Sequence, residues 1–250
     1  MHPVRGVPAP GARHIPFVAW LVLPSLIAWT AGAPVASAQT ARVDVGSFTT
    51  YVDGRRAGRE QFSLQSLANA DGGNYELRME SASGERRSAV RLETDSVGTP
   101  LRYTVEERVG ARVTLRLGGQ RTRGRFATLA RGTRGEAARE YLLTAGAVVL
   151  EAEGVHQYCM LVRNRGMREG DSVEVATLSP LENRQGTVRL VLQSVTDSVI
   201  IAGARRDARR WRAVAQDGAE RLIWADAEGR ILRLRIPARR FEALRDDVPR

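Results

Sequence analysis

Alternation between apolar and polar residues is the feature that most restricts how this chain can fold. In segment 112–117, valine and leucine take every second position, with arginine or threonine between them, and segments 101–109 and 188–192 follow a similar pattern. Successive side chains of a β-strand point to opposite faces, so a period of two predicts a strand with one apolar and one solvated face. That division is typical of antiparallel sheets.

Glycine-containing turn signals separate these alternating segments. They are Asp53-Gly54, Asp71-Gly72-Gly73, Ser83-Gly84, Val109-Gly110, Gly118-Gly119 and Asp217-Gly218. Glycine supplies the positive φ that tight hairpins need, and a spacing of about 10 to 15 residues is near that of a meander. The sequence therefore predicts a mainly β fold: a single large curved antiparallel meander, open or half-barrel, of about a dozen strands.

One or two short helices are expected against the concave face of this sheet. In segment 152–165, Val155, Tyr158, Cys159 and Val162 recur at helical spacing and predict one apolar helix face. For segment 238–246, after Pro237, a short helix and a final strand are both open.

The N-terminal segment has the order of a secretory signal. Arg5 and Arg13 precede an apolar stretch at 15–29, and Ala36-Ser37-Ala38 provides a small-residue cleavage site. The apolar stretch is shorter than the roughly 20 residues that a spanning helix needs. We therefore expect a signal peptide over 1–38, a single exported β domain over 39–250, a periplasmic or secreted location, and no stable membrane span after signal removal.

The positive charge of the chain does not indicate nucleic-acid binding. The formal net charge is +10, and all 38 basic residues are arginine, which indicates codon bias. The arginines are spread along the chain, whereas a nucleic-acid site needs a concentrated patch. We expect no nucleic-acid partner, while a weak attraction to anionic lipid or polysaccharide stays open.

Residues for catalysis or metal binding are scarce. Segment 39–250 contains a single histidine, His156, and the chain a single cysteine, Cys159, so no intrachain disulfide forms. His156 and Cys159 with a nearby glutamate fall short of a four-ligand metal site, and Cys159 is expected to be a buried small side chain. The sequence predicts no metal, cofactor or catalytic site.

One serine resembles a nucleophile only superficially. Gly170-Asp171-Ser172-Val173 is similar to the block of the Gly-Asp-Ser-Leu esterases, but no histidine follows it. A serine without a positioned base is not activated, so we expect a turn that enters a strand. Adjacent carboxylates such as Glu106 and Glu107 would point to opposite faces of a strand.

The C-terminal segment 221–237 predicts a hairpin with a defined register. A turn from Asp226 to Arg230, closed by Gly229 with positive φ, would form a three-residue hairpin loop. This register pairs Trp224 with Leu232 and places them, with Leu234, on the inward face. It sends Ile223 and Ala225 to the outward face, and it makes Asp226 the acceptor that opens the turn.

Three segments carry a resemblance to a family. "WADAEGRILRLRIP", "YVDGRRAGREQFSL" and "VVLEAEGVHQYCMLVRN" resemble exported bacterial proteins of unknown function with a C-terminal D-x-x-G-R-x-L-R-x-x-I-P type hairpin. That family is distantly similar in fold to the periplasmic lipoprotein-localisation factors, in which a curved sheet wraps around helices and shelters an acyl chain. The resemblance implies a fold and transfers no catalytic residue.

These observations favour a non-enzymatic envelope protein that binds a lipid or other hydrophobic ligand, or an envelope protein partner, in the concave face of the sheet. The candidate ligand-facing residues are Trp224, Leu232, Leu234, Tyr158 and His156. Two alternatives stay open: a structural or assembly protein, and a hydrolase of envelope glycan or lipid that works through two carboxylates.

Overall fold

The computed structural model describes residues 40–67, 73–133, 135–152, 154–163 and 165–249. The predicted signal peptide 1–38 lies outside the described residues and stays a prediction. The first eight strands are β1 (Thr40–Val52), β2 (Arg55–Leu67), β3 (Asn74–Ser83), β4 (Arg86–Thr94), β5 (Pro100–Val109), β6 (Arg112–Thr122), β7 (Arg125–Gly132) and β8 (Gly135–Leu142). The other elements are β9 (Val148–Val149), η1 (His156–Tyr158), α1 (Cys159–Val162), β10 (Ser172–Ser179), β11 (Arg184–Ile201), β12 (Ala204–Ala215), β13 (Glu220–Ala225), β14 (Ile231–Ile236), η2 (Pro237–Arg239) and β15 (Phe241–Arg245).

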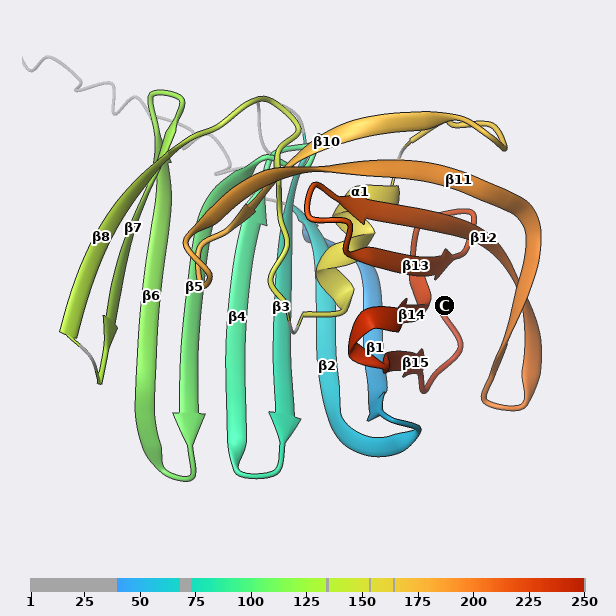
Figure 1. The fold of residues 1–250 in the computed structure, drawn as a ribbon, viewed down its shortest axis with the longest axis horizontal. Helices are drawn as coiled ribbons and strands as arrows, with labels where there is room; N and C mark the ends of the chain where they lie inside the picture. The colour runs from blue at the N-terminus through green and yellow to red at the C-terminus, as the bar shows by residue number, and fades with distance from the viewer. Residues whose placement is uncertain (1–39, 68–72, 134, 153, 164, 250) are drawn as a thin grey trace, which may run out of the picture. The chain divides into compact units, whose positions relative to one another are not determined.

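All described strands belong to one open sheet, in the order β8-β7-β6-β5-β4-β3-β2-β1-β15-β14-β13-β12-β11-β10-β9 (Figure 1). The mainly β fold with a single large sheet is therefore confirmed. Two details differ from the prediction: the described chain has 15 strands, and β9 pairs in parallel with β10. The first strand β1 lies beside the last strand β15, so the sheet has two arms, β2–β8 and β14–β9, that meet at this pair.

Four of the predicted turns are confirmed by positive φ values at the hairpin tips. They are Gly54, Gly84, Gly110 and Gly218. The predicted turn at Asp71-Gly72-Gly73 falls largely on residues outside those described.

The predicted turn at Gly118-Gly119 is wrong. Both glycines lie inside β6, and the chain turns later, where Arg123 and Gly124 have positive φ. A side chain at Gly119 would place its Cβ 2.6 Å from the ring of Phe126 on β7, so glycine is needed there for packing. At Gly118 a Cβ would meet nothing within 4 Å.

The main core lies between the inner faces of the two arms and contains η1 and α1. It includes Phe62 and Leu77 from the first arm and Leu190 and Ile223 from the second. The helical segment is shorter than the predicted 152–165, and every residue from 156 to 162 is buried. The predicted short helix is therefore confirmed over a shorter range, and its predicted apolar residues are buried. It differs from the prediction in having no solvated face, because the segment is part of the core on all sides. Neither this helix nor any other in the described chain is long and apolar enough to cross a membrane.

The alternative left open for 238–246 is resolved as a short 3₁₀ turn followed by a strand. η2 begins at Pro237, and β15 then pairs with both β1 and β14. Arg240 between them has positive φ, which ends the helical turn.

The hairpin between β13 and β14 has the predicted turn but not the predicted register. The Asp226 N–H donates to the Arg230 carbonyl (3.0 Å), and Gly229 has φ +79°. Ala225 pairs with Ile231 but Trp224 with Arg233, so one extra residue, Leu232, forms a bulge in β14. A one-residue shift exchanges the faces of a strand.

The bulge places Leu232 and Leu234 on opposite faces of β14. In β13, the face that points to the core is the opposite of the one predicted. Ile223 and Ala225, predicted to face outward, are 0% exposed and belong to the main core. Trp224 and Leu232 instead belong to a second, smaller cluster with Val199 on the other face of the sheet.

Candidate functional site

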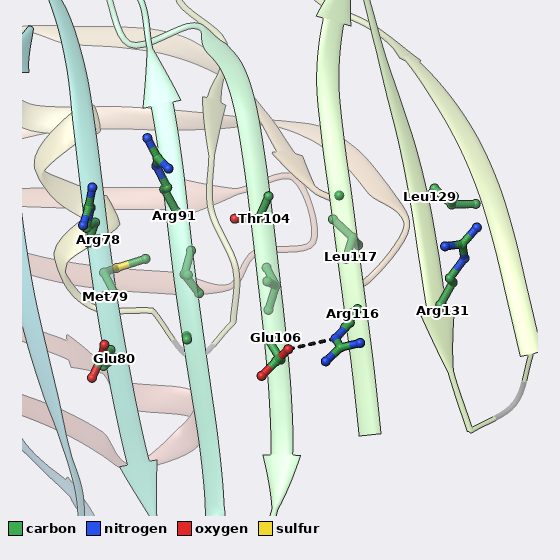
Figure 2. A pocket seen from close by; sticks show the side chains of 14 residues that line it. Arg78, Met79, Glu80, Arg91, Thr104, Glu106, Arg116, Leu117, Leu129 and Arg131 are labelled. Atoms are coloured by element: carbon green, nitrogen blue, oxygen red, sulfur yellow. Dashed lines mark hydrogen bonds and ion pairs between the residues drawn. The ribbon is translucent and has the colours of Figure 1, made fainter. Parts of the chain in front are cut away.

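A trough of about 710 Å³ lies on the outer face of β3–β7 (Figure 2). Met79, Val90, Val105 and Leu117 are buried or packed on the core side of these strands. Their chain neighbours, such as Arg78 and Arg91, must point away from the core, because side chains alternate along a strand. The trough therefore lies on the face opposite the main core.

Small residues form the floor of this trough. One row of paired residues crosses the strands from Arg91 through Thr104 and Gly118 to Leu129. Because long side chains stand at its ends and small ones at its centre, the row has a depression in the middle. Ala89 lies beside the same depression.

Guanidinium groups outnumber carboxylates along the trough. Glu76 accepts hydrogen bonds from both Arg78 and Arg91, and Glu106 accepts from Arg108 and from Arg116 at 2.8 Å. Burial would raise the pKa of Glu76, but the bonds from the two arginines outweigh it and lower that pKa. The bonds from Arg116 and Arg108 also lower the pKa of Glu106.

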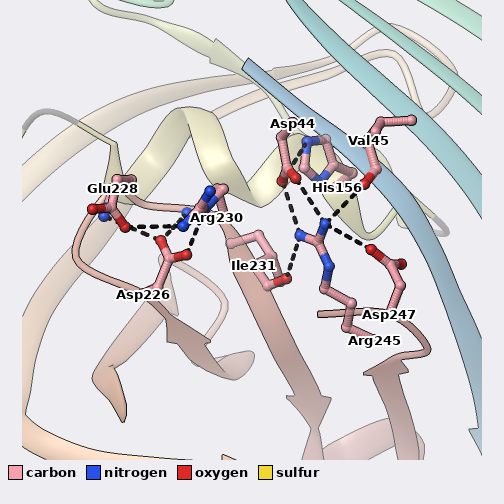
Figure 3. Close-up of polar contacts among 9 residues, drawn as sticks. All are labelled: Asp44, Val45, His156, Asp226, Glu228, Arg230, Ile231, Arg245 and Asp247. Atoms are coloured by element: carbon pink, nitrogen blue, oxygen red, sulfur yellow. Dashed lines mark hydrogen bonds and ion pairs between the residues drawn. The ribbon is translucent and has the colours of Figure 1, made fainter. Parts of the chain in front are cut away.

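A buried ion pair connects the first and last strands (Figure 3). The Arg245 guanidinium donates to both oxygens of Asp44, at 2.8 and 3.0 Å, and to the Val45 carbonyl at 2.9 Å. The side chains of Asp44 and Arg245 are 2% and 0% exposed. Asp247, which is 41% exposed, adds a contact at 3.2 Å. The pair is closed to a substrate, and we interpret it as structural.

Glu60 and His156 lie next to this pair in the core. Glu60 accepts hydrogen bonds from the backbone N–H groups of Val155 (2.9 Å) and His156 (2.8 Å), so it holds the start of η1. The His156 ring stacks on Phe62 with centroids 3.7 Å apart, and neither ring nitrogen has a hydrogen-bond partner in the described chain. Burial raises the pKa of Glu60 to about 7 and lowers the pKa of His156 well below its usual value.

These two shifts predict opposite effects of pH on stability. Glu60 has an ordinary pKa of 4.5 and a folded pKa of about 7, so its stabilising contribution is present below pH 4.5 and lost as pH rises through about 7. The lowered pKa of His156 gives a contribution that is present above its ordinary pKa and lost as pH falls. Asp44 and Glu151, whose pKa values burial also raises, act in the direction of Glu60.

Glu60→Gln should therefore make the free energy of unfolding rise more steeply with pH between 5 and 7 than in the wild type. The difference in slope should reach about 1.4 kcal/mol per pH unit, because one titrating proton is removed. Urea denaturation across this pH range measures it. In Glu80→Gln, at an exposed position in β3, the free energy of unfolding should change with pH as it does in the wild type. Equal slopes for Glu60→Gln and the wild type would contradict a raised pKa of Glu60 in the folded state.

Another buried carboxylate, Glu151, joins separate parts of the chain. It accepts hydrogen bonds from the Tyr103 hydroxyl (3.1 Å), the Ser179 hydroxyl (2.5 Å) and the Leu181 N–H (3.1 Å). Burial raises the pKa of Glu151 despite these bonds. Since Glu151 is 6% exposed and Tyr103 only 1%, this cluster also fits a structural role.

The structure does not bring the five candidate ligand-facing residues together. His156, Tyr158 and Leu234 belong to the main core, whereas Trp224 and Leu232 are in the second cluster. The Tyr158 hydroxyl accepts a bond from Arg221 at 2.8 Å, and the Trp224 indole donates to Asp197 at 3.1 Å. None of the five lines the trough.

Two expectations about reactive residues can be compared with the structure. Cys159 is 1% exposed, as predicted, and burial raises the pKa of its thiol to about 12. Ser172 is the first residue of β10 and follows a turn at Gly170, as predicted. Within the described residues, no three histidine, cysteine, aspartate or glutamate side chains are grouped so that they could hold a metal ion.

The trough was not predicted from the sequence, because a glycine on its floor was taken as part of a hairpin turn. Gly118 follows the alternating stretch of β6 and was interpreted as a hairpin tip. β6 continues through both glycines to Thr122, and the chain turns at Arg123 and Gly124. The alternation ends at Leu117, so the sequence carries no apolar signal that β6 continues through the two glycines.

Comparisons with known proteins support the fold. No protein-family model and no curated protein matches the chain. A solved beta-barrel-like protein of the domain of unknown function DUF1849 from Brucella abortus is similar, with a TM-score of 0.51 and 12% identity over 82% of this chain and 95% of that one. A DUF1089 family protein from Pseudomonas aeruginosa has a TM-score of 0.43 and 13% identity over 72% and 90%. At 12% identity the likeness to the DUF1849 protein concerns the fold alone.

Proposed function

We propose that this chain is a non-enzymatic binding protein of the cell envelope and that its ligand is an amphiphile with an acyl chain and an anionic head group. The trough on the outer face of β3–β7 carries the proposal. It is a different place from the concave face suggested by the sequence, because the space between the sheet and α1 is filled by buried side chains such as Phe62, Tyr158 and Leu161.

The trough suits an acyl chain on its floor. Ala89, Thr104 and Gly118 leave the main chain of β4–β6 accessible, and Leu129 adds an apolar wall. Arginine side chains contribute methylene stems to such a surface while their charged ends stay in water. A chain lying along the depression would therefore contact mostly carbon atoms.

The charges at the rim favour an anionic head group. Arg78, Arg91, Arg116 and Arg131 line the trough with only two glutamates, Glu80 and Glu106. Guanidinium groups bind carboxylate and phosphate through charge-assisted hydrogen bonds. All four arginines pair with glutamates, but Arg78 and Arg91 share the single carboxylate of Glu76. An anionic head would therefore fit best beside these two arginines.

A catalytic role is less consistent with the same residues. A hydrolase that works through two carboxylates needs one of them protonated as a general acid. Two arginines lower the pKa of Glu106 in the trough, while Glu60 and Glu151, whose pKa values are raised, are buried in the core. Export, as proposed from segment 1–38, would place such a binding protein among envelope lipids.

Gly118→Phe tests the proposal. The new side chain would fill the centre of the trough without disturbing the core, because a Cβ at this position meets nothing within 4 Å. We expect binding of cis-parinaric acid, measured by fluorescence titration of delipidated protein, to weaken at least about tenfold, since an acyl chain loses several buried methylene groups at about 0.8 kcal/mol each.

Two controls complete this test. Ala127→Phe adds the same ring to an exposed position of β7 outside the trough, and it should bind like the wild type. The methyl ester of cis-parinaric acid should bind more weakly than the acid because it carries no charge. Equal affinity of Gly118→Phe and the wild type would exclude the trough, and equal affinity for acid and ester would exclude the anionic head group.

A further inference from the structure

A second hollow, of about 150 Å³, lies between the β4–β5 turn and the chain leaving α1. Tyr75, Ser96 and Gly98 line one side, and Met160, Arg163 and Arg165 line the other. It shares no lining residue with the trough. We name it the arginine cleft.

The turn side of the arginine cleft is held in a fixed shape. The Asp95 carboxylate accepts hydrogen bonds from the backbone N–H groups of Val97 (3.2 Å) and Thr99 (2.8 Å). Gly98 has φ +93°, and a Cβ on it would lie 3.9 Å from Met160. The turn is therefore packed against α1 and closed by its own hydrogen bonds.

The opposite side is fixed by the β13–β14 hairpin. A Cβ on Gly229 would lie 2.9 Å from the Cα of Arg163, so the hairpin tip touches the backbone that carries this arginine. The Arg163 guanidinium lies over the ring of Tyr75, 5.1 Å from its centroid. Arg165 donates from Nε to the Leu161 carbonyl at 2.9 Å.

The two arginines of the cleft lack counterions. All four trough arginines pair with glutamates, but no described carboxylate lies within ion-pair distance of Arg163 or Arg165. The Nε and Nη1 atoms of Arg163 are buried and have no acceptor in the described chain. Burial lowers the pKa of Arg165. The Asp95 carboxylate, although close by in the turn, pairs with Arg121 at 3.1 Å.

Two partly buried positive charges without a counterion are unfavourable, because an aromatic ring or a carbonyl compensates the desolvation of a charge less than a partner of opposite sign does. We infer that the arginine cleft binds a small oxyanion of the phosphate type, either inorganic phosphate or the phosphate of a phosphomonoester. A phosphate group carries a charge of about −1.5 to −2 near pH 7. That charge matches the two guanidinium groups, and Ser96, which also lines the cleft, carries a hydroxyl that can donate a further hydrogen bond.

Phosphate titration of the full chain tests this inference. At constant ionic strength, inorganic phosphate should bind saturably by isothermal titration calorimetry and raise the melting temperature, whereas chloride should do neither. Arg163→Gln and Arg165→Gln should each weaken phosphate binding at least about tenfold, because each removes a charge-assisted hydrogen bond. Arg165→Gln keeps the test valid if Arg163→Gln fails to fold.

Matched variants distinguish phosphate binding in the arginine cleft from a general attraction of phosphate to the positively charged protein. Arg168→Gln removes the same charge at an exposed position three residues further on, and it should bind phosphate like the wild type. Gly118→Phe should also bind phosphate normally, so the arginine cleft and the proposed function can fail separately. A second titration with glycerol 3-phosphate distinguishes the two sources: tighter binding than phosphate indicates a phosphomonoester, and weaker binding indicates the free ion.

The inference is overturned if phosphate produces no saturable heat and no more stabilisation than chloride. It is also overturned if both Arg163→Gln and Arg165→Gln bind phosphate as tightly as Arg168→Gln does.

Discussion

Arg245→Met should lower the free energy of unfolding by about 3–5 kcal/mol, because it leaves the Asp44 carboxylate buried without its counterion. Both oxygens of Asp44 accept bonds from Arg245, and the Asp44 side chain is only 2% exposed. The arginine also joins β15 to the Val45 carbonyl of β1. Urea denaturation at pH 8 measures the loss.

The pH dependence of this variant provides a further check. The His156 Nε2 lies 3.8 Å from Asp44, and the charge of Arg245 helps to keep His156 neutral. Without Arg245, a protonated His156 would become a partner for Asp44. The destabilisation caused by Arg245→Met should therefore be smaller at pH 5 than at pH 8.

The double variant Asp44→Leu/Arg245→Met is the matched control. Removing both charges leaves neither one unpaired, and buried ion pairs replaced by apolar residues are often neutral in stability. The double variant should therefore be more stable than Arg245→Met alone. The single variants Asp44→Leu and Arg245→Met each lower the free energy of unfolding by some amount. If these two amounts add in the double variant, or if Arg245→Met is within about 1 kcal/mol of the wild type, the pair does not stabilise the fold in this way.

The fold class could be predicted because local patterns determine it. Alternation in β5, β6 and β11 marks strands wherever one face is buried, and glycines with positive φ mark most of the hairpin tips. The pairing of β1 with β15 could not be predicted, because it joins residues about 200 positions apart. Neither Asp44 nor Arg245 differs in its local sequence from the many exposed charges of this chain.

The register of the hairpin was mispredicted for a related reason. The turn chemistry of Asp226 and Gly229 is local and was predicted correctly, whereas the bulge at Leu232 has no signal in the turn residues. Both faces of β13 and β14 are apolar at this point, since Ile223 and Trp224 are both buried. A strand buried on both faces gives no alternation by which to choose a register.

The two candidate sites were not predicted, because their residues are typical of solvated surfaces. Arg78, Arg91 and Arg116 occupy polar positions of alternating strands, and only the small residues between them make a trough. Arg163 and Arg165 lie in a segment that the sequence assigned to a helix. Their lack of counterions is a property of the folded chain and depends on which carboxylates lie nearby.

Gly229→Ala should lower the free energy of unfolding by about 2–5 kcal/mol. Two effects combine at this residue. Its φ of +79° is unfavourable for a residue with a side chain, at about 1–2 kcal/mol. In addition, the new Cβ would lie 2.9 Å from the Cα of Arg163, and crowding of packed atoms adds about 1–3 kcal/mol. Thermal and urea denaturation both measure the loss.

Gly218→Ala separates the two effects. Gly218 has the same φ of +79°, but a Cβ there meets nothing within 4 Å. It should therefore show the backbone strain alone, and the difference between the two variants measures the contact of the hairpin tip with Arg163. Because that contact fixes one wall of the arginine cleft, Gly229→Ala should also weaken phosphate binding, whereas Gly218→Ala should not. Equal losses of stability in the two variants would mean that the hairpin tip does not press on Arg163.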